Sequence, residues 1–192
     1  MSRTMKALLA VWIAVLVGAA GWIGWDAWQG KQPSLGGPFA LVDQNGKPFS
    51  SDRLKGKPTL IYFGYAFCPD VCPTSLLLME TAIEQLGPDV PKKVNLVFIT
   101  IDPERDTPEL IKGYVENFSP SFIGLTGTPE QIAQAARAYR VYYQKRPGKD
   151  GDPYLMDHSS IVYVLDRNGR FVTHFTHEAK AEAIAKAVQR LL

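Results

Sequence analysis

The sequence lacks a strong excess of charge of either sign. Its 192 residues carry 21 basic and 19 acidic side chains, which gives a formal net charge of +2. A chain this close to neutral lacks the excess of basic residues that binds the phosphates of nucleic acid, so we expect no nucleic-acid partner. Apolar residues make up 46% of the chain and charged residues 21%, which is ordinary for a globular protein, and the length favours one domain.

Two further absences concern the N-terminus. Residues 1–28 contain no cysteine, which excludes a lipoprotein anchor in this segment. No transit peptide rich in Arg and Ser precedes the apolar run that follows Lys6. This favours a bacterial inner membrane over a mitochondrial one.

The apolar run itself predicts a membrane anchor. Residues 7–25 are nineteen residues without a charged side chain. A helix of that length spans roughly 28 Å, about the thickness of a bilayer core. Arg3 and Lys6 precede the run and three tryptophans gather at its far end, so the N-terminus is expected in the cytoplasm. A cleaved signal peptide with a cut near Gly18-Ala19-Ala20 is the alternative.

The chain is therefore expected to have four parts. We predict a cytoplasmic basic segment, one transmembrane helix, a linker rich in Gly and Gln, and a folded periplasmic domain, over residues 1–6, 7–28, 29–37 and 38–192.

Strands alternate with helices along the folded domain. Apolar runs predict strands at 39–43, 48–49, 59–63, 94–101, 122–126, 161–165 and 171–175. Helix formers and capping residues predict helices at 74–86, 108–118, 129–139 and 178–192. Asn45-Gly46 predicts a hairpin turn between the first two strands. This order is that of an α/β thioredoxin-like fold with an N-terminal β-hairpin extension and an inserted helix.

Both cysteines of the chain lie at one strand-to-helix corner. Cys68 and Cys72 follow the strand Thr59–Phe63, and Pro73 suits the first turn of the next helix. A helix N-terminus favours thiolate over thiol. One helical turn would put both sulfurs on one face, where they can close a disulfide or bind one soft metal ion. Two inert buried cysteines, or a purely structural disulfide, are the alternatives.

One histidine is expected beside the two cysteines. His158 precedes the strand Ile161–Leu165, in the loop that faces the cysteine corner in a thioredoxin-like fold. Two thiolates and one imidazole form a soft set, one ligand short of a closed zinc site, which favours copper as Cu(I) and also admits Cu(II). The alternative for His158 is a hydrogen-bonded core residue. Met156 is either a further soft ligand or a packing residue, and the remaining two histidines are expected at the surface, at His174 and His177.

Three motifs of this sequence resemble the SCO/SenC family. They are the Phe63–Thr74 stretch with Cys-Pro-Asp-Val-Cys-Pro, the Asp102–Pro108 stretch, and Asp157-His158-Ser159. The first motif is specific because ordinary thioredoxins carry two residues between the cysteines, whereas three stand here. Members of this family are membrane-anchored copper proteins of thioredoxin-like fold that help assemble the dinuclear copper site of cytochrome c oxidase. The resemblance covers residues 36–192.

The resemblance implies a function and a set of ligands. The family's copper ligands fall on Cys68, Cys72 and His158, and its acidic residue between the cysteines falls on Asp70. We therefore expect a copper chaperone whose partners are subunit II of cytochrome c oxidase and another periplasmic copper carrier. Asp70 and the loop Asp102–Thr107 are expected near the docking face.

A thiol–disulfide oxidoreductase is the alternative function. In it Cys68 attacks, Cys72 resolves, and His158 tunes the pKa without binding metal. A peroxidase is less favoured, because a peroxide-reducing cysteine needs no second cysteine four residues on. The two main functions also combine, since metal binding needs the reduced pair and a disulfide would switch copper affinity off.

Overall fold

The computed structural model describes residues 5, 12–22, 25, 35–148 and 153–192. The chain divides into two compact units, Met1–Ser34 and Leu35–Leu192. In the first unit, residues 12–22 are helical and their side chains are exposed.

The predicted N-terminal transmembrane helix is contradicted. Within the described residues, none of the helices combines the length and the apolar character needed to cross a membrane. Most of the remaining positions of the predicted anchor over residues 7–28, and of the predicted segments 1–6 and 29–37, lie outside the described residues.

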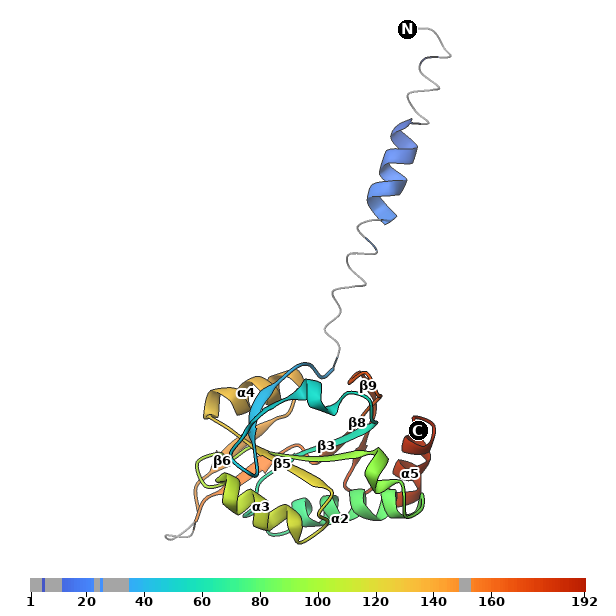
Figure 1. The fold of residues 1–192 in the computed structure, drawn as a ribbon. Coiled ribbons are helices and arrows are strands. Elements are labelled where there is room, and N and C mark those ends of the chain that lie inside the picture. The colour runs from blue at the N-terminus through green and yellow to red at the C-terminus, as the bar shows by residue number, and fades with distance from the viewer. Residues whose placement is uncertain (1–4, 6–11, 23–24, 26–34, 149–152) are drawn as a thin grey trace. The chain divides into compact units, whose positions relative to one another are not determined.

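A mixed seven-stranded sheet forms the centre of the second unit (Figure 1). Its strands lie in the spatial order β2 (Pro48–Ser50), β1 (Ala40–Asp43), β5 (Phe122–Thr126), β4 (Asn95–Thr100), β3 (Thr59–Gly64), β8 (Ile161–Leu165) and β9 (Phe171–Thr176). Strands β3, β4 and β5 run parallel, and their neighbours are antiparallel. The central strands β3 and β4 are buried along their whole length, as their continuous apolar sequences predict.

Helices cover both faces of this sheet. They are α2 (Val71–Glu84), α3 (Pro108–Glu116), α4 (Pro129–Ala138) and α5 (Ala181–Gln189), with short 3₁₀ turns at Ser51–Leu54 and Pro91–Lys93. Figure 1 shows α4 on one side and α2 and α3 on the other. Thr107 and Thr128 cap α3 and α4, each followed by proline, as the sequence predicted. The predicted α/β layering is therefore confirmed.

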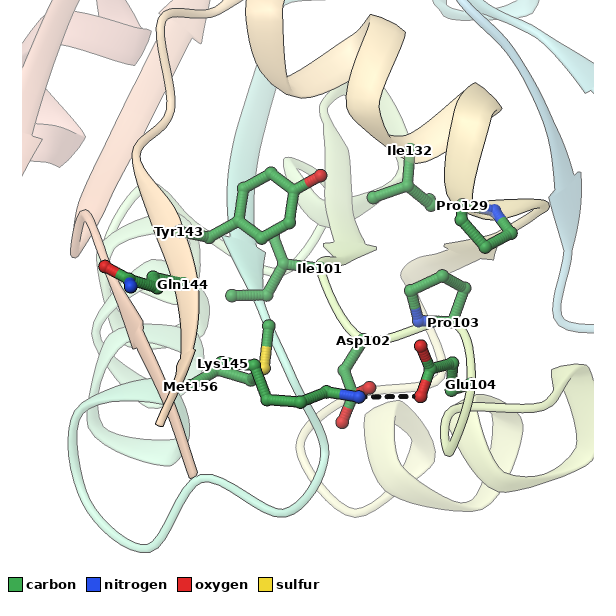
Figure 2. A pocket seen from close by; sticks show the side chains of 10 residues that line it. All are labelled: Ile101, Asp102, Pro103, Glu104, Pro129, Ile132, Tyr143, Gln144, Lys145 and Met156. Atoms are coloured by element: carbon green, nitrogen blue, oxygen red, sulfur yellow. Dashed lines mark hydrogen bonds and ion pairs between the residues drawn. The ribbon is translucent and has the colours of Figure 1, made fainter. Parts of the chain in front are cut away.

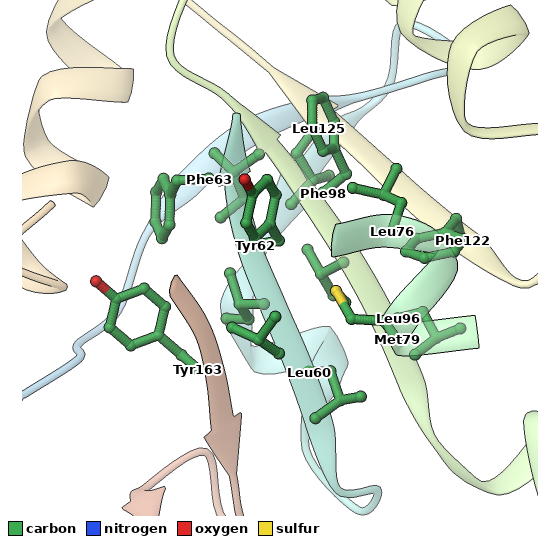
Figure 3. Close-up of a cluster of buried hydrophobic side chains, with 14 of the residues drawn as sticks. Leu60, Tyr62, Phe63, Leu76, Met79, Leu96, Phe98, Phe122, Leu125 and Tyr163 are labelled. Atoms are coloured by element: carbon green, nitrogen blue, oxygen red, sulfur yellow. The ribbon is translucent and has the colours of Figure 1, made fainter. Parts of the chain in front are cut away.

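The alternation of side chains along β3 divides the core into two layers. Phe63 points toward α4, where it meets Tyr139 and Tyr163 at centroid distances of 5.4 and 6.1 Å. Tyr62, the preceding residue, points the other way and contacts Cys72 of α2. Figure 3 shows Phe63 and Tyr62 pointing in different directions from β3. Each layer is closely filled, so the end of β3 is a rigid platform for the residues that follow it.

One hairpin was not predicted. The sequence pattern predicts no strand between residues 126 and 161, but β6 (Tyr143–Arg146) pairs antiparallel with β7 (Leu155–His158). The two strands form a sheet of their own, separate from the main one. β6 is half-buried to exposed and reads Tyr-Gln-Lys-Arg, so it carries no apolar alternation that would identify a strand.

Candidate metal centre

The two cysteines lie at the predicted corner but not on one helical face. Helix α2 begins at Val71, so Cys72 is its second residue and Cys68 lies in the loop before it. Pro73 falls in the first turn of α2, where its missing N–H costs nothing. Both cysteines are free thiols; Cys68 is 9% exposed and Cys72 is fully buried.

The hairpin brings His158 to the cysteines. His158 is the last residue of β7, and its Nε2 lies 3.4 Å from Cys72 Sγ. Its Nδ1 lies 3.1 Å from the carbonyl oxygen of Ser159. Because a carbonyl can only accept, Nδ1 carries the proton of the neutral ring, and Nε2 turns its lone pair toward the thiols.

The two cysteines differ in their affinity for a proton. The pKa of Cys68 is lowered to about 4, first by the hydrogen bond from Cys72, then by the neighbouring His158 side chain and by hydrogen bonds from backbone N–H groups of Asp70 and Cys72. Burial raises the pKa of Cys72 far above its usual range, and the adjacent Cys68 raises it further. The pair therefore holds one thiolate, at Cys68, and one thiol, at Cys72.

Aromatic rings enclose the imidazole on two sides. Tyr62 and Tyr65 meet His158 edge to face, at centroid distances of 6.2 and 5.8 Å. The Tyr62 hydroxyl donates to Cys72 Sγ at 3.9 Å and lies 3.1 Å from Ser160 Oγ. Burial raises the pKa of Tyr62 far above its usual range, so the phenol stays protonated. These contacts orient the ring of His158 and leave a polar donor beside the buried sulfur.

Gly64 leaves the space that Cys72 occupies. A Cβ on Gly64 would lie 2.7 Å from Cys72 Sγ and 2.9 Å from the Tyr62 ring. A larger residue at the end of β3 would thus push the sulfur out of place. The glycine is needed here for the close approach of strand and helix, not for an unusual backbone angle.

The donor set fits a soft metal ion. The ligand atoms of Cys68, Cys72 and His158 all lie within 4.8 Å of one another. Bonds of about 2.3 Å to sulfur and 2.0 Å to nitrogen place three ligands about 4 Å apart around one ion, so small movements suffice to close the site. Within the described ranges this is the one group of three His, Cys, Asp or Glu residues that can hold a metal, and it offers no carboxylate for hard cations.

The other predicted residues lie around this centre in different roles. Asp70 is exposed and contributes its backbone N–H to Cys68. Met156 is 8% exposed and lines a cavity, which agrees with packing. His174 and His177 are exposed, as predicted.

The expected docking loop is partly internal. Asp102 is 2% exposed and Asp106 is fully buried, so these two carboxylates are not available to a partner, whereas Glu104 and Thr107 of the same loop are exposed. Asp106 Oδ2 accepts hydrogen bonds from the Thr100 hydroxyl and from the backbone N–H of Ala66, at 2.6 and 3.0 Å. Through the hydrogen bond to Ala66, the loop therefore helps to hold the segment that precedes Cys68 in place.

Sequence reasoning missed three residues that shape the centre. Tyr62 and Gly64 share one face of β3, and their period-2 spacing could have identified them as neighbours of the cysteine helix. Arg105 was noted only as part of a loop. Its aromatic partners come from segments far apart in the chain, so no local pattern indicates them.

Comparison with known proteins agrees with the fold and the centre. The chain matches the SCO1/SenC family over residues 28–192. An SCO2-like protein of Rickettsia prowazekii is 46% identical over 153 residues, which are 78% of this chain and 73% of that protein.

Solved structures are similar over most of the chain. The structure of Bradyrhizobium japonicum ScoI with copper bound is 50% identical, with a TM-score of 0.75, over 83% of this chain and 100% of that one. A SCO1/SenC family lipoprotein from Bacillus anthracis is 25% identical, with a TM-score of 0.69, over 84% of this chain and 98% of that one.

The family match extends beyond the three motifs that first indicated it. It includes the sheet, the cysteine corner and the hairpin that carries the histidine. The thioredoxin-like part of the predicted fold is confirmed by the similar structures. On these grounds the chain belongs to the SCO1/SenC family.

Proposed function

We propose that this protein is a copper chaperone that binds copper through Cys68, Cys72 and His158. The observation that carries the proposal is the convergence of two sulfurs and one imidazole nitrogen within 4.8 Å. Thiolates select Cu(I) among the available ions, and imidazole also suits copper. The copper-bound structure of the Bradyrhizobium relative supports the choice of metal.

The protonation of the site prepares it for a cation. Cys68 presents a thiolate, and Nε2 of His158 presents a lone pair. Cys72 must lose its proton when it becomes a ligand, so binding releases a proton from a buried thiol. Three ligands leave a position open, which suits copper carried as cargo and released to a recipient.

The proposed recipient is the dinuclear copper site in subunit II of cytochrome c oxidase, and another periplasmic copper carrier is the proposed donor. The family resemblance supports the recipient. We also propose that residues 38–192 form the copper domain, that 29–37 link it to the preceding chain, and that the domain works in the periplasm. A strain that lacks the protein should lose oxidase activity under limiting copper, and wild type but not Cys72→Ser should restore it.

A Cu(I) titration of the reduced full-length chain, in competition with a chromophoric chelator, tests the site. We expect one tightly bound equivalent. Since loss of an outer partner of a metal ligand costs about 10–100-fold in affinity, Cys72→Ser and His158→Ala should each cost more than about 10-fold. His174→Ala is the matched control, because this histidine is exposed on β9. Weak wild-type binding, or equal binding by His158→Ala, would refute the copper centre.

A thiol–disulfide oxidoreductase is the second candidate function. It is favoured by the low pKa of Cys68 and by the buried Cys72 beside it, which suit an attacking and a resolving cysteine. The thiolate would attack a disulfide of the recipient, and Cys72 would then release the recipient as a dithiol while the pair becomes a disulfide. A reduction potential near that of known thiol reductases, together with weak copper binding, would favour this function.

The two functions can share one switch. A disulfide between Cys68 and Cys72 removes two of the three ligands, so we propose that oxidation abolishes copper binding. The same titration on the oxidised chain checks this hypothesis. Tight Cu(I) binding by the disulfide form would exclude it.

A further inference from the structure

The third ligand depends on a hairpin outside the main sheet. Cys68 and Cys72 follow the buried strand β3, but His158 ends β7, which pairs with β6 in a separate two-stranded sheet. Tyr143 of β6 lies opposite His158 in the register. Whatever fixes this hairpin against the body of the domain therefore fixes the position of the imidazole.

Packing beneath the hairpin is incomplete. A cavity of about 210 Å³ lies between the hairpin, the loop after β4 and the first turn of α4. Figure 2 shows Tyr143 and Met156 from the hairpin facing Ile101 and Ile132 across this space. Because apolar contact is interrupted here, specific polar contacts have a larger share in holding the hairpin.

Arg105 makes the buried polar contacts of the hairpin. Its Nη1 donates to the backbone carbonyl of Tyr154 at 2.9 Å, and its guanidinium lies 3.7 Å from the centre of the Tyr154 ring. Nε of Arg105 donates to Asp102 Oδ2, and the Tyr154 hydroxyl donates to Asp102 Oδ1 at 2.9 Å. We call these three residues, Asp102, Arg105 and Tyr154, the Arg105 bracket. It joins the loop after β4 to the residue before β7.

Arg105 also lies near two aromatic side chains of the segment that leads to Cys68. The guanidinium lies 5.8 Å from the centre of the Tyr65 ring and 4.9 Å from that of Phe67, the residue before Cys68. Tyr65 in turn meets the ring of His158 edge to face. A planar cation between aromatic faces fixes their relative positions, which a lysine cannot do equally well.

The other ion pairs of the hairpin are exposed. Lys145 pairs with Glu104, as Figure 2 shows, and the side chains are 44% and 62% exposed. Arg146 pairs with Asp157, at 67% and 43%. Surface pairs of this kind contribute little. The side chains of Arg105 and Asp102 are only 18% and 2% exposed, so their contacts are the ones shielded from water.

We propose that Arg105 is a positioning residue for His158, holding the hairpin so that the imidazole stays within reach of both sulfurs. Arg105 does not touch the metal in this proposal; it acts through Tyr154 and Tyr65. The inference rests on the proposed copper function, since its purpose is to place the third ligand.

A double-mutant cycle tests the proposal. Cu(I) affinity is measured for wild type, Arg105→Met, His158→Ala and the double variant, all as reduced full-length chains. We expect Arg105→Met to weaken binding at least about 10-fold when His158 is present, as loss of an outer partner of a ligand does, and less than about 2-fold when it is absent. Equal losses in both backgrounds, or no loss in either, would overturn the proposal.

A second readout needs no metal. Amide hydrogen exchange of β7 in the metal-free protein should become at least about 10-fold faster in Arg105→Met, while α2 keeps its protection. Unchanged exchange in β7 would also overturn the proposal. If the wild type fails to bind copper, the proposed function falls, and this exchange measurement still decides whether Arg105 holds the hairpin.

Two further variants separate a loss of positioning from a loss of folding in Arg105→Met. Arg53→Met is the matched control, because Arg53 also pairs with an aspartate and lies 4.6 Å from the centre of an aromatic ring, that of Phe49. It should leave copper affinity and β7 exchange unchanged. If Arg105→Met does not fold, Tyr154→Phe replaces it in the cycle, with a smaller loss expected and again only when His158 is present. Equal losses in both backgrounds would again overturn the proposal.

Discussion

The cysteine corner and the β6–β7 hairpin supply ligands to the same centre but are built differently. Cys72 is fully buried between α2 and β3, and its sulfur fits a space that Gly64 leaves free. His158 ends a short strand whose hairpin lies over a cavity and is held by the Arg105 bracket. The sulfur side of the centre is fixed by core packing, and the imidazole side by a few polar contacts.

This difference separates the stability of the domain from the geometry of its metal centre. A change at the corner disturbs the core and the site together, because the same side chains serve both. A change in the hairpin can move one ligand and leave the core intact, since local opening costs less than global unfolding.

The largest effect is expected from Gly64→Ala. The new Cβ would lie 2.7, 2.9 and 3.1 Å from Cys72 Sγ, the Tyr62 ring and the Phe98 ring. Overpacking of this kind should lower the free energy of unfolding by about 3 kcal/mol and weaken copper binding as well. Urea denaturation and the Cu(I) titration measure both. Gly113→Ala is the control, because its Cβ would meet open space on a helix and should be neutral or stabilising. If Gly64→Ala is as stable as wild type, the corner is less tightly packed than described.

A pH-dependent effect of about 2–3 kcal/mol is expected from Asp106, beneath the cysteine loop. Burial raises the pKa of Asp106 to about 6, and its Oδ1 has no hydrogen-bond partner within the described part of the chain. The folded chain holds this proton more tightly than the unfolded chain, whose pKa is near 3.8. Stability from this group is therefore lost as pH rises from 4 to 7.

Asp106→Asn provides the measurement. Its amide can still accept the Ala66 N–H but does not titrate in this range. The difference in unfolding free energy between Asp106→Asn and wild type should grow in favour of the variant from pH 4 to pH 7. Parallel stability curves for the two proteins would contradict the assignment.

A smaller effect is expected on the hairpin side from Tyr154→Phe. The change removes one hydroxyl that donates to Asp102, which is worth about 1 kcal/mol. Hydrogen exchange of the β6 and β7 amides should rise about fivefold, while exchange in β3 and α2 stays the same. An equal rise in all four elements would show that the hairpin is not a separate cooperative unit.

The smallest effect is expected from Arg146→Met. Its ion pair with Asp157 lies on the same hairpin but both side chains are well exposed. Removing it should change the unfolding free energy by less than about 0.5 kcal/mol and leave copper affinity unchanged. A larger change would mean that surface charge, and not the Arg105 bracket, holds the hairpin.

The contrast also explains which parts of the protein were predictable. Continuous apolar runs fix β3 and β4, and threonine followed by proline fixes the starts of α3 and α4, because these signals depend on neighbouring residues. The hairpin β6–β7 was not predicted, because its strands are short and half-exposed and therefore show no apolar alternation. The transmembrane helix was predicted from an apolar run with basic residues before it and tryptophans at its far end, and within the described residues no helix is long and apolar enough to cross a membrane.

Local pattern and residue chemistry suffice to predict the α/β order and the position of both cysteines at a strand-to-helix corner. His158 was predicted as their companion from the thioredoxin-like fold and the family resemblance, and not from a local pattern. The orientation of Nε2 of His158 toward the sulfurs, the proton kept by Cys72, and the parts played by Gly64, Asp106 and Arg105 follow from tertiary contacts. They could not be predicted because the residues in contact lie far apart along the chain. These properties arise from contacts between segments 40 to 86 residues apart, such as Ala66 with Asp106, Arg105 with Tyr154, and Cys72 with His158, and no local pattern encodes such contacts.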